Sequence, residues 1–201
     1  MKMNRLGRTD LVVSDLCLGT MTFGQQNTEE EAHQQLNYAV EQGVNFFDTA
    51  EMYSIPGKKE TQGSTERYIG SWLKDQKRED LVIGTKVTGP MPYFNYLRDN
   101  LGFSKEVIHD ALNQSLKRLQ TDYIDLYQLH WPNRPFPHFG DNHAGKIDFT
   151  ASHSSEIEDN LLDILKLLSQ KYSAKQDFLD RSQVLLQNAA KPYKLVLLQS
   201  I

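Results

Sequence analysis

Residues 43–48 have the sequence Gly-Val-Asn-Phe-Phe-Asp, a short apolar run with helical patterns on both sides. On the amino side, Thr28 opens a Thr-x-x-Glu capping box, after which apolar residues recur at helical intervals up to the glycine at 43. On the carboxyl side, a second helical pattern begins at Ser64. A run this short between two helices is typical of a buried strand, which here ends at Asp48.

The same alternation of strand and helix extends over most of the chain. Strands are predicted at 16–19, 44–48, 81–87 and 123–129, and helices at 28–43, 64–73, 104–119 and 157–168. A small hairpin over about residues 3–12 precedes them and is expected to close the bottom of the sheet. Such alternation indicates an α/β fold with a parallel sheet and helical crossovers.

Two parallel architectures compete, the doubly wound open sheet and the eight-stranded barrel. No Gly-x-Gly-x-x-Gly follows any predicted strand, so the dinucleotide-binding doubly wound fold lacks its fingerprint. The long connections, at 50–63, 88–103 and 131–155, all follow a strand and precede a helix. In a barrel they would all lie at the C-terminal face, where active sites are built, so the sequence favours a partial TIM barrel of about four βα units.

Composition restricts the class of protein. The 201 residues are 39% hydrophobic and 24% charged with a net charge of -4, which suits one globular domain or two small ones and argues against nucleic-acid binding. Cys17 is the only cysteine, which favours a reducing compartment. No apolar run has the length of a membrane helix and no signal-peptide core follows the N-terminus, so a cytoplasmic protein is expected.

Polar residues cluster at the predicted strand ends. Asp48, Lys86 and His130 lie at or near three of these ends, and Tyr53 follows shortly after the second. Taken singly, each has an ordinary structural explanation: a solvated lysine, a capping aspartate or a core histidine. Together they suit carbonyl reduction, because an ammonium beside a phenol lowers its pKa, a carboxylate orients the ammonium, and an imidazole can bind the substrate oxygen. The hydride would have to come from a cofactor.

Four motifs occur in a fixed order along the chain. They are Leu-Gly-Thr-Met-Thr-Phe-Gly at 18–24, Gly-Val-Asn-Phe-Phe-Asp-Thr-Ala-Glu-Met-Tyr at 43–53, Thr-Lys-Val at 85–87, and Ser-Leu-Lys-Arg-Leu-Gln-Thr-Asp-Tyr-Ile-Asp-Leu-Tyr-Gln-Leu-His-Trp-Pro at 115–132. Over about residues 3–170 the chain resembles the aldo-keto reductase superfamily, in the branch of the Tas-type enzymes and the potassium-channel β-subunit relatives. The resemblance implies a TIM barrel that reduces aldehydes or ketones with NADPH.

The resemblance also implies roles for single residues. Tyr53 would be the general acid, Lys86 and Asp48 the groups that tune it, and His130 the group that orients the substrate. The residues implied in binding NADPH are Gly19, Thr20, Met21, Gln26 and Asp48.

The resemblance weakens toward the end of the sequence. Residues 171–201 contain no glycine and nothing like the family's Ser-Asn strand end that holds the nicotinamide amide. We therefore expect a family-like domain over 1–170, a divergent tail over 171–201, and weak or absent activity for these 201 residues. The alternative is a non-catalytic regulatory or binding relative, or a splice or gene-model remnant. Open sheet edges would favour pairing with another chain.

Three further features are interpreted as structural. His138, His143 and His153 share a loop, but their spacing matches no standard metal site, so no metal is predicted. Cys17 is expected in the core and Arg78 on a solvated face.

Overall fold

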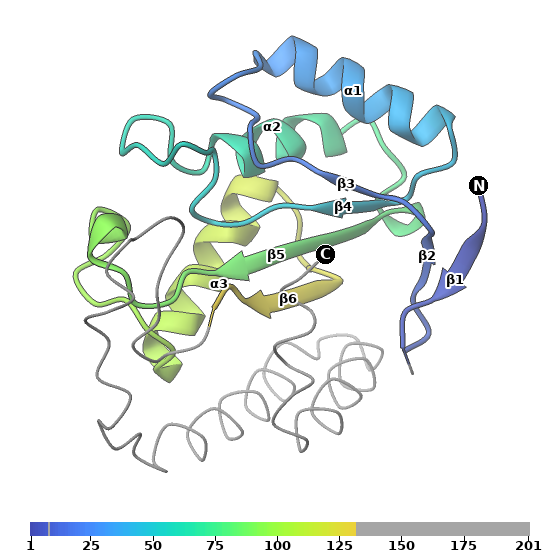
Figure 1. Ribbon diagram of the computed structural model, residues 1–201. Helices are drawn as coiled ribbons and strands as arrows, with labels where there is room; N and C mark the ends of the chain where they lie inside the picture. Colours follow the sequence, from blue (N-terminus) through green and yellow to red (C-terminus); the bar gives the residue numbers. More distant parts are fainter. Residues whose placement is uncertain (8, 132–201) are drawn as a thin grey trace, which may run out of the picture.

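The computed structural model describes residues 1–7 and 9–131. Its central element is a sheet of four parallel strands that lie side by side in chain order, as Figure 1 shows: β3 (Cys17–Gly19), β4 (Phe46–Asp48), β5 (Val82–Val87) and β6 (Leu126–Leu129). In a barrel, consecutive parallel strands lie side by side in chain order. In a doubly wound sheet, the strand order reverses at a switch point. The predicted parallel order and the α/β fold class are confirmed.

Three helices connect these strands and cover one face of the sheet (Figure 1): α1 (Glu29–Glu41), α2 (Ser64–Leu73) and α3 (Lys105–Leu119). The capping box before α1 is present, since Thr28 accepts a hydrogen bond from the backbone of Glu31 and the Glu31 carboxylate accepts one from the backbone of Thr28. Ser104 caps α3 with a single bond, since its hydroxyl accepts a hydrogen bond from the backbone N–H of Val107. Two 3-10 turns complete the connections, η1 (Arg78–Asp80) and η2 (Pro92–Phe94).

The main core lies between the sheet and the helices. Phe47 of β4 and Ile83 of β5 are fully buried there, because alternate strand residues point to the helix side. They pack in one cluster with apolar residues of all three helices, among them Leu36, Ile69 and Ile108.

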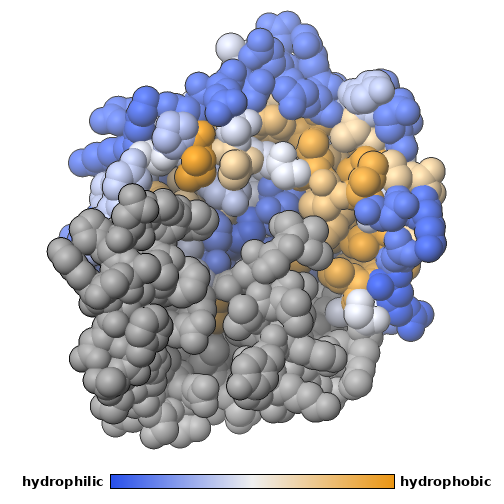
Figure 2. Space-filling view, viewed as in Figure 1, coloured by the Kyte–Doolittle hydropathy of each residue, from blue (hydrophilic) through white to orange (hydrophobic). Residues whose placement is uncertain are grey.

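A hairpin covers the amino ends of the strands on the other face. It is formed by β1 (Met3–Arg5) and β2 (Val12–Ser14), which pair antiparallel, and it confirms the predicted hairpin, extended to Ser14. Val13 of the hairpin and Leu11 pack against Val82 of β5 in a second apolar cluster. This face is hydrophobic beside the hairpin and hydrophilic toward the middle (Figure 2). A polar site is therefore expected in the hydrophilic region of this face, away from the hairpin.

Two expectations about single residues are wrong. Cys17 is exposed rather than buried in the core, because in β3 it is Leu18, its neighbour, that packs against the core. Arg78 is mostly buried, because its guanidinium pairs with Asp125 at 2.7 Å and lies 4.0 Å from the ring centre of Tyr123.

Several predictions fall outside the described residues: the helix at 157–168, the tail over 171–201, and the loop with His138, His143 and His153. Within the described part, β3 and β6 each have a hydrogen-bonded neighbour on one side, and pairing through these edges stays a prediction. Among residues 1–7 and 9–131, no helix is both long and apolar enough to cross a membrane.

Candidate active site

The carboxyl ends of β4, β5 and β6 bring the predicted residues together. Asp48 is the last residue of β4, and its register partner on β5 is Gly84. Lys86, two residues further along β5, therefore points to the same side of the sheet as Asp48. His130 directly follows β6, where its backbone N–H donates to the carbonyl of Val87 at 3.0 Å.

Lys86 and Asp48 form an ion pair at this end of the sheet. Lys86 Nζ donates to Asp48 Oδ2 at 2.7 Å and to the carbonyl oxygen of Thr49 at 2.8 Å. The Lys86 side chain is 11% exposed and that of Asp48 26%. Burial lowers the pKa of Lys86, and the charge and hydrogen bond of Asp48 oppose this shift. The pair thus places a partly desolvated ammonium at the mouth of the barrel.

Tyr53 lies beside this pair in the loop after β4. Its side chain is buried, and Lys86 Nζ lies 4.9 Å from its ring centre. Its ring packs edge to face against His130, with 5.7 Å between the ring centres. The four predicted side chains therefore converge, as the strand-end pattern indicated.

The expected lowering of the Tyr53 pKa is wrong. Burial raises the pKa of Tyr53, and the nearby Asp48 carboxylate raises it further. Both act in the same direction, because a desolvated phenolate close to a negative charge is unfavourable. Tyr53 is accordingly a protonated phenol at neutral pH.

His130 is a neutral imidazole in this arrangement. Burial, and then the positive charge of Lys86, lowers the pKa of His130 to about 3. Its Nδ1 atom is buried and has no hydrogen-bond partner among the described residues. A neutral imidazole can donate a hydrogen bond from one nitrogen and accept one at the other.

Three of the residues predicted to bind the cofactor lie next to Asp48. Gly19 pairs with Asp48 across the two strands, and a Cβ atom at Gly19 would meet no atom within 4 Å. Met21 is 49% exposed at the same edge. Thr20 is fully buried and its hydroxyl donates to the carbonyl of Asp48 at 2.9 Å, so it stabilises the strand end. Gln26 is exposed in the turn before α1, where its backbone bonds to the carbonyl of Thr22.

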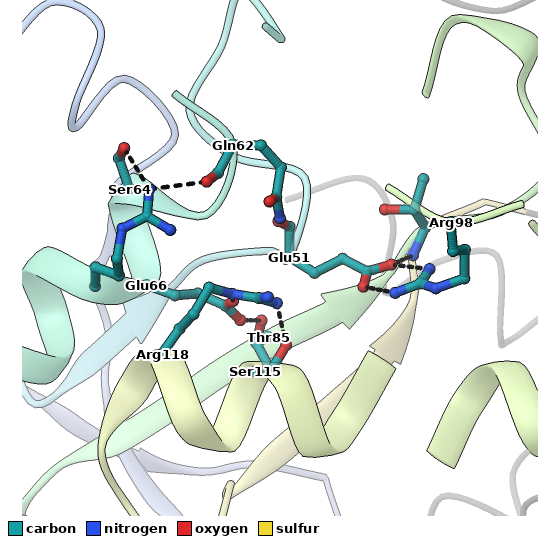
Figure 3. A network of polar contacts seen from close by, with 10 residues as sticks. Glu51, Gln62, Ser64, Glu66, Thr85, Arg98, Ser115 and Arg118 are labelled. Atoms are coloured by element: carbon teal, nitrogen blue, oxygen red, sulfur yellow. Dashed lines mark hydrogen bonds and ion pairs between the residues drawn. The ribbon is translucent and has the colours of Figure 1, made fainter. Parts of the chain in front are cut away.

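Sequence reasoning missed two buried carboxylates close to the site (Figure 3). Glu51 is paired with Arg98 and Glu66 with Arg118, and both carboxylates are almost fully buried. Glu51 offered one signal, since it stands between the apolar Ala50 and Met52. A charged residue inside such a run is either exposed or paired, and the sequence alone does not name its partner.

Comparison with known proteins identifies the family. The model of the aldo/keto reductase family matches residues 15–174. The chain belongs to the aldo/keto reductase family. Protein tas of Escherichia coli is 48% identical over 172 residues, which cover 85% of this chain and 48% of that protein. A probable voltage-gated potassium channel subunit beta of Arabidopsis thaliana is 37% identical over 140 residues, 68% of this chain and 39% of that protein.

Solved aldo-keto reductase structures agree with the fold. AKR11C1 from Bacillus halodurans, in its holo form, superposes with a TM-score of 0.60 at 32% identity, covering 85% of this chain and 47% of that one. The thermostable aldo-keto reductase Tm1743, in complex with the inhibitor epalrestat, gives a TM-score of 0.58 at 29% identity, covering 85% and 50%. This aldo/keto reductase chain therefore has the TIM-barrel fold class and spans about half the length of the relatives it matches.

Proposed function

We propose that this chain carries the catalytic half of an NADPH-dependent reductase of aldehydes or ketones, with Tyr53 as the general acid. The observation that carries the proposal is the convergence of Tyr53 and Lys86 with Asp48 and His130 at one end of the sheet. Family membership supports the reaction class.

The chemistry assigns one task to each side chain. Tyr53 gives its hydroxyl proton to the carbonyl oxygen of the substrate as hydride reaches the carbonyl carbon, which yields an alcohol; the phenolate then regains a proton from water. Lys86 stabilises that phenolate, and Asp48 holds Lys86 in place. His130 donates a hydrogen bond to the carbonyl oxygen. General acid catalysis of this kind contributes about 10²–10⁴-fold to the rate.

The residues fit the nicotinamide end of NADPH, which supplies the hydride. The space above Gly19 is open on the side of the sheet that carries Asp48 and Lys86, so a flat ring can approach the strand end there. Met21 is exposed beside it and would contact the ring or its ribose. Asp48 would bind a ribose hydroxyl with the carboxylate oxygen that Lys86 leaves free.

The proposal includes a small carbonyl compound as the partner and a cytoplasmic location. A single cysteine in 201 residues suits a reducing compartment. The net charge of -4 does not favour nucleic acid as a partner.

The test compares these 201 residues with a fusion of residues 1–170 to the C-terminal half of Protein tas. NADPH binding is measured by fluorescence titration, and turnover is measured with 4-nitrobenzaldehyde. The fusion should reduce the aldehyde, and Tyr53→Phe should remove most of this turnover while leaving the circular dichroism spectrum unchanged. Turnover that persists in the Tyr53→Phe fusion, or a folded fusion without turnover, would contradict the proposal.

A second candidate is a regulatory or binding role without catalysis. It is supported by the similarity to a probable potassium channel subunit beta. In that case the fusion would bind NADPH but would show no turnover of the aldehyde. Tyr53→Phe would then leave the NADPH affinity unchanged.

A further inference from the structure

Glu51 lies in the loop after β4, three residues after Asp48, the last residue of that strand, and two before Tyr53. Its side chain is 1% exposed and points toward Arg98 (Figure 3). A carboxylate this deeply buried needs hydrogen bonds and a counter-charge. The proposed reaction gives it no task.

Glu51 binds the end of strand β5 at two points. Its backbone N–H donates to the carbonyl oxygen of Lys86 at 3.2 Å, and its Oε1 accepts from the backbone N–H of Thr88 at 2.6 Å. These two bonds bracket the peptide units on both sides of Val87. They fix the backbone of Lys86 relative to the loop that carries Tyr53.

Arg98 holds the Glu51 carboxylate in the orientation that these bonds require. Its guanidinium binds both carboxylate oxygens, with Nη1 3.0 Å from Oε1 and Nη2 in close contact with Oε2. Its Nε lies 3.6 Å from Oδ2 of Asp110 on α3. A fork of two parallel bonds fixes direction as well as charge, which a single ammonium would not do.

Arg98 remains charged in this setting. Burial alone would lower the pKa of Arg98, but the hydrogen bonds and the charge of Glu51, with that of Asp110, raise it. Arg98 belongs to the connection from β5 to α3. The contact therefore joins three separate segments behind the catalytic cluster: the loop after β4, the connection after β5, and helix α3.

We propose that Glu51 and Arg98 form a positioning pair that sets the placement of Tyr53 relative to Lys86 and His130. The inference rests on the function proposed above. Neither residue touches the reacting atoms, and the pair acts through the backbone of Lys86 and Thr88 and through the loop that carries Tyr53.

The test uses Arg98→Met and Glu51→Gln in the 201-residue chain. Arg98→Met removes the fork, whereas Glu51→Gln keeps an acceptor for Thr88 and removes the charge. The matched control is Arg78→Met, which breaks another buried arginine–carboxylate pair, with Asp125, near the amino ends of β5 and β6. All variants are compared at a temperature at which circular dichroism shows them folded.

The first measurement is the nuclear Overhauser effect between the ring protons of Tyr53 and His130, whose rings are in contact. It should be lost in Arg98→Met, weakened in Glu51→Gln, and retained in Arg78→Met. If Arg98→Met does not fold, the comparison of the Overhauser effect in Glu51→Gln with that in Arg78→Met tests the positioning role. An unchanged effect in the folded Arg98 and Glu51 variants, or an equal loss in the Arg78 control, would overturn the proposal.

The second measurement is the steady-state reduction of 4-nitrobenzaldehyde by the same substitutions placed in the fusion of residues 1–170 to the C-terminal half of Protein tas. Misplacement by about 1 Å can cost on the order of 10²-fold in rate, so Arg98→Met should lower kcat on that scale and leave KM nearly unchanged. A change confined to KM would contradict positioning. If the fusion without substitutions folds but shows no turnover, the proposed function fails, and the Overhauser measurement alone decides whether the pair positions Tyr53.

Discussion

Lys86 lies over Tyr53, with Nζ 4.9 Å from the centre of the phenol ring. The same ammonium donates to Asp48 Oδ2 at 2.7 Å. Its positive charge is therefore largely matched by the carboxylate, and that carboxylate raises the pKa of Tyr53 in addition to the effect of burial. Asp48 thus opposes ionisation of the phenol while it holds Lys86 in place.

Asp48→Asn should lower the pKa of Tyr53. The substitution removes the negative charge that disfavours the phenolate. The measurement is the pH titration of the tyrosine Cζ carbon signals by NMR, with Tyr53→Phe identifying the signal. Asp125→Asn is the control, because Asp125 lies near the other end of the sheet. A Tyr53 pKa that rises or stays constant in Asp48→Asn would refute this explanation.

His130 should make the fold less stable as the pH falls. Its pKa is about 3 in the folded chain and about 6.5 in an unfolded one, so between these values the unfolded state binds a proton that the folded state does not. The free energy of unfolding therefore decreases as the pH drops below about 6.5, and this contribution is fully present only above that value. At pH 5 the loss should reach up to about 2 kcal/mol.

Urea unfolding at pH 7 and pH 5 measures this effect. His130→Asn should lose less stability than the wild type over this interval, because asparagine does not titrate. Other histidines, such as His33, are common to both proteins and cancel in the comparison. Equal losses in the two proteins would show that His130 titrates normally.

Within residues 1–131, local pattern was sufficient to predict the main strands and helices and their order. The capping box at Thr28 and the strand that ends at Asp48 are local features, and both are present where the sequence placed them. The convergence of Lys86 with Asp48 also followed from pattern, because carboxyl ends of adjacent parallel strands lie at one edge.

The electrostatics of the site could not be predicted in the same way. The sequence indicated that Lys86 would lower the pKa of Tyr53, but the outcome depends on how deeply the phenol is buried and on which partner Lys86 binds. The Glu51–Arg98 pair joins residues 47 positions apart, and nothing in the sequence pairs them. The burial of Arg78 was likewise not predictable. Its partner Asp125 is 47 positions away in the sequence, and only folding brings the two together.

Gly70 should tolerate no side chain. A Cβ atom there would lie 2.2 Å from the backbone oxygen of Arg118, where α2 crosses the end of α3. Alanine would gain about 0.8–1.0 kcal/mol in helix propensity, but overpacking against backbone costs about 1–3 kcal/mol or more, so Gly70→Ala should be destabilising. Gly84→Ala is the control, since its Cβ would meet Leu126 at an ordinary 3.6 Å. Chemical unfolding that shows no greater loss for Gly70→Ala than for Gly84→Ala would contradict the close packing.

The last prediction concerns NADPH affinity. Gly19, Met21 and Asp48 would lie at the nicotinamide end of the cofactor, and residues 171–201 lack the family's Ser-Asn strand end. Net hydrogen bonds contribute about 0.5–1.5 kcal/mol each, so losing the Ser and Asn contacts to the nicotinamide amide raises the dissociation constant by at least about 5-fold. Fluorescence titration should show that the 201 residues bind NADPH at least that much more weakly than the fusion of residues 1–170 to the C-terminal half of Protein tas. Equal affinities of the two chains would mean that the segment after residue 170 contributes nothing to cofactor binding, and would contradict this prediction.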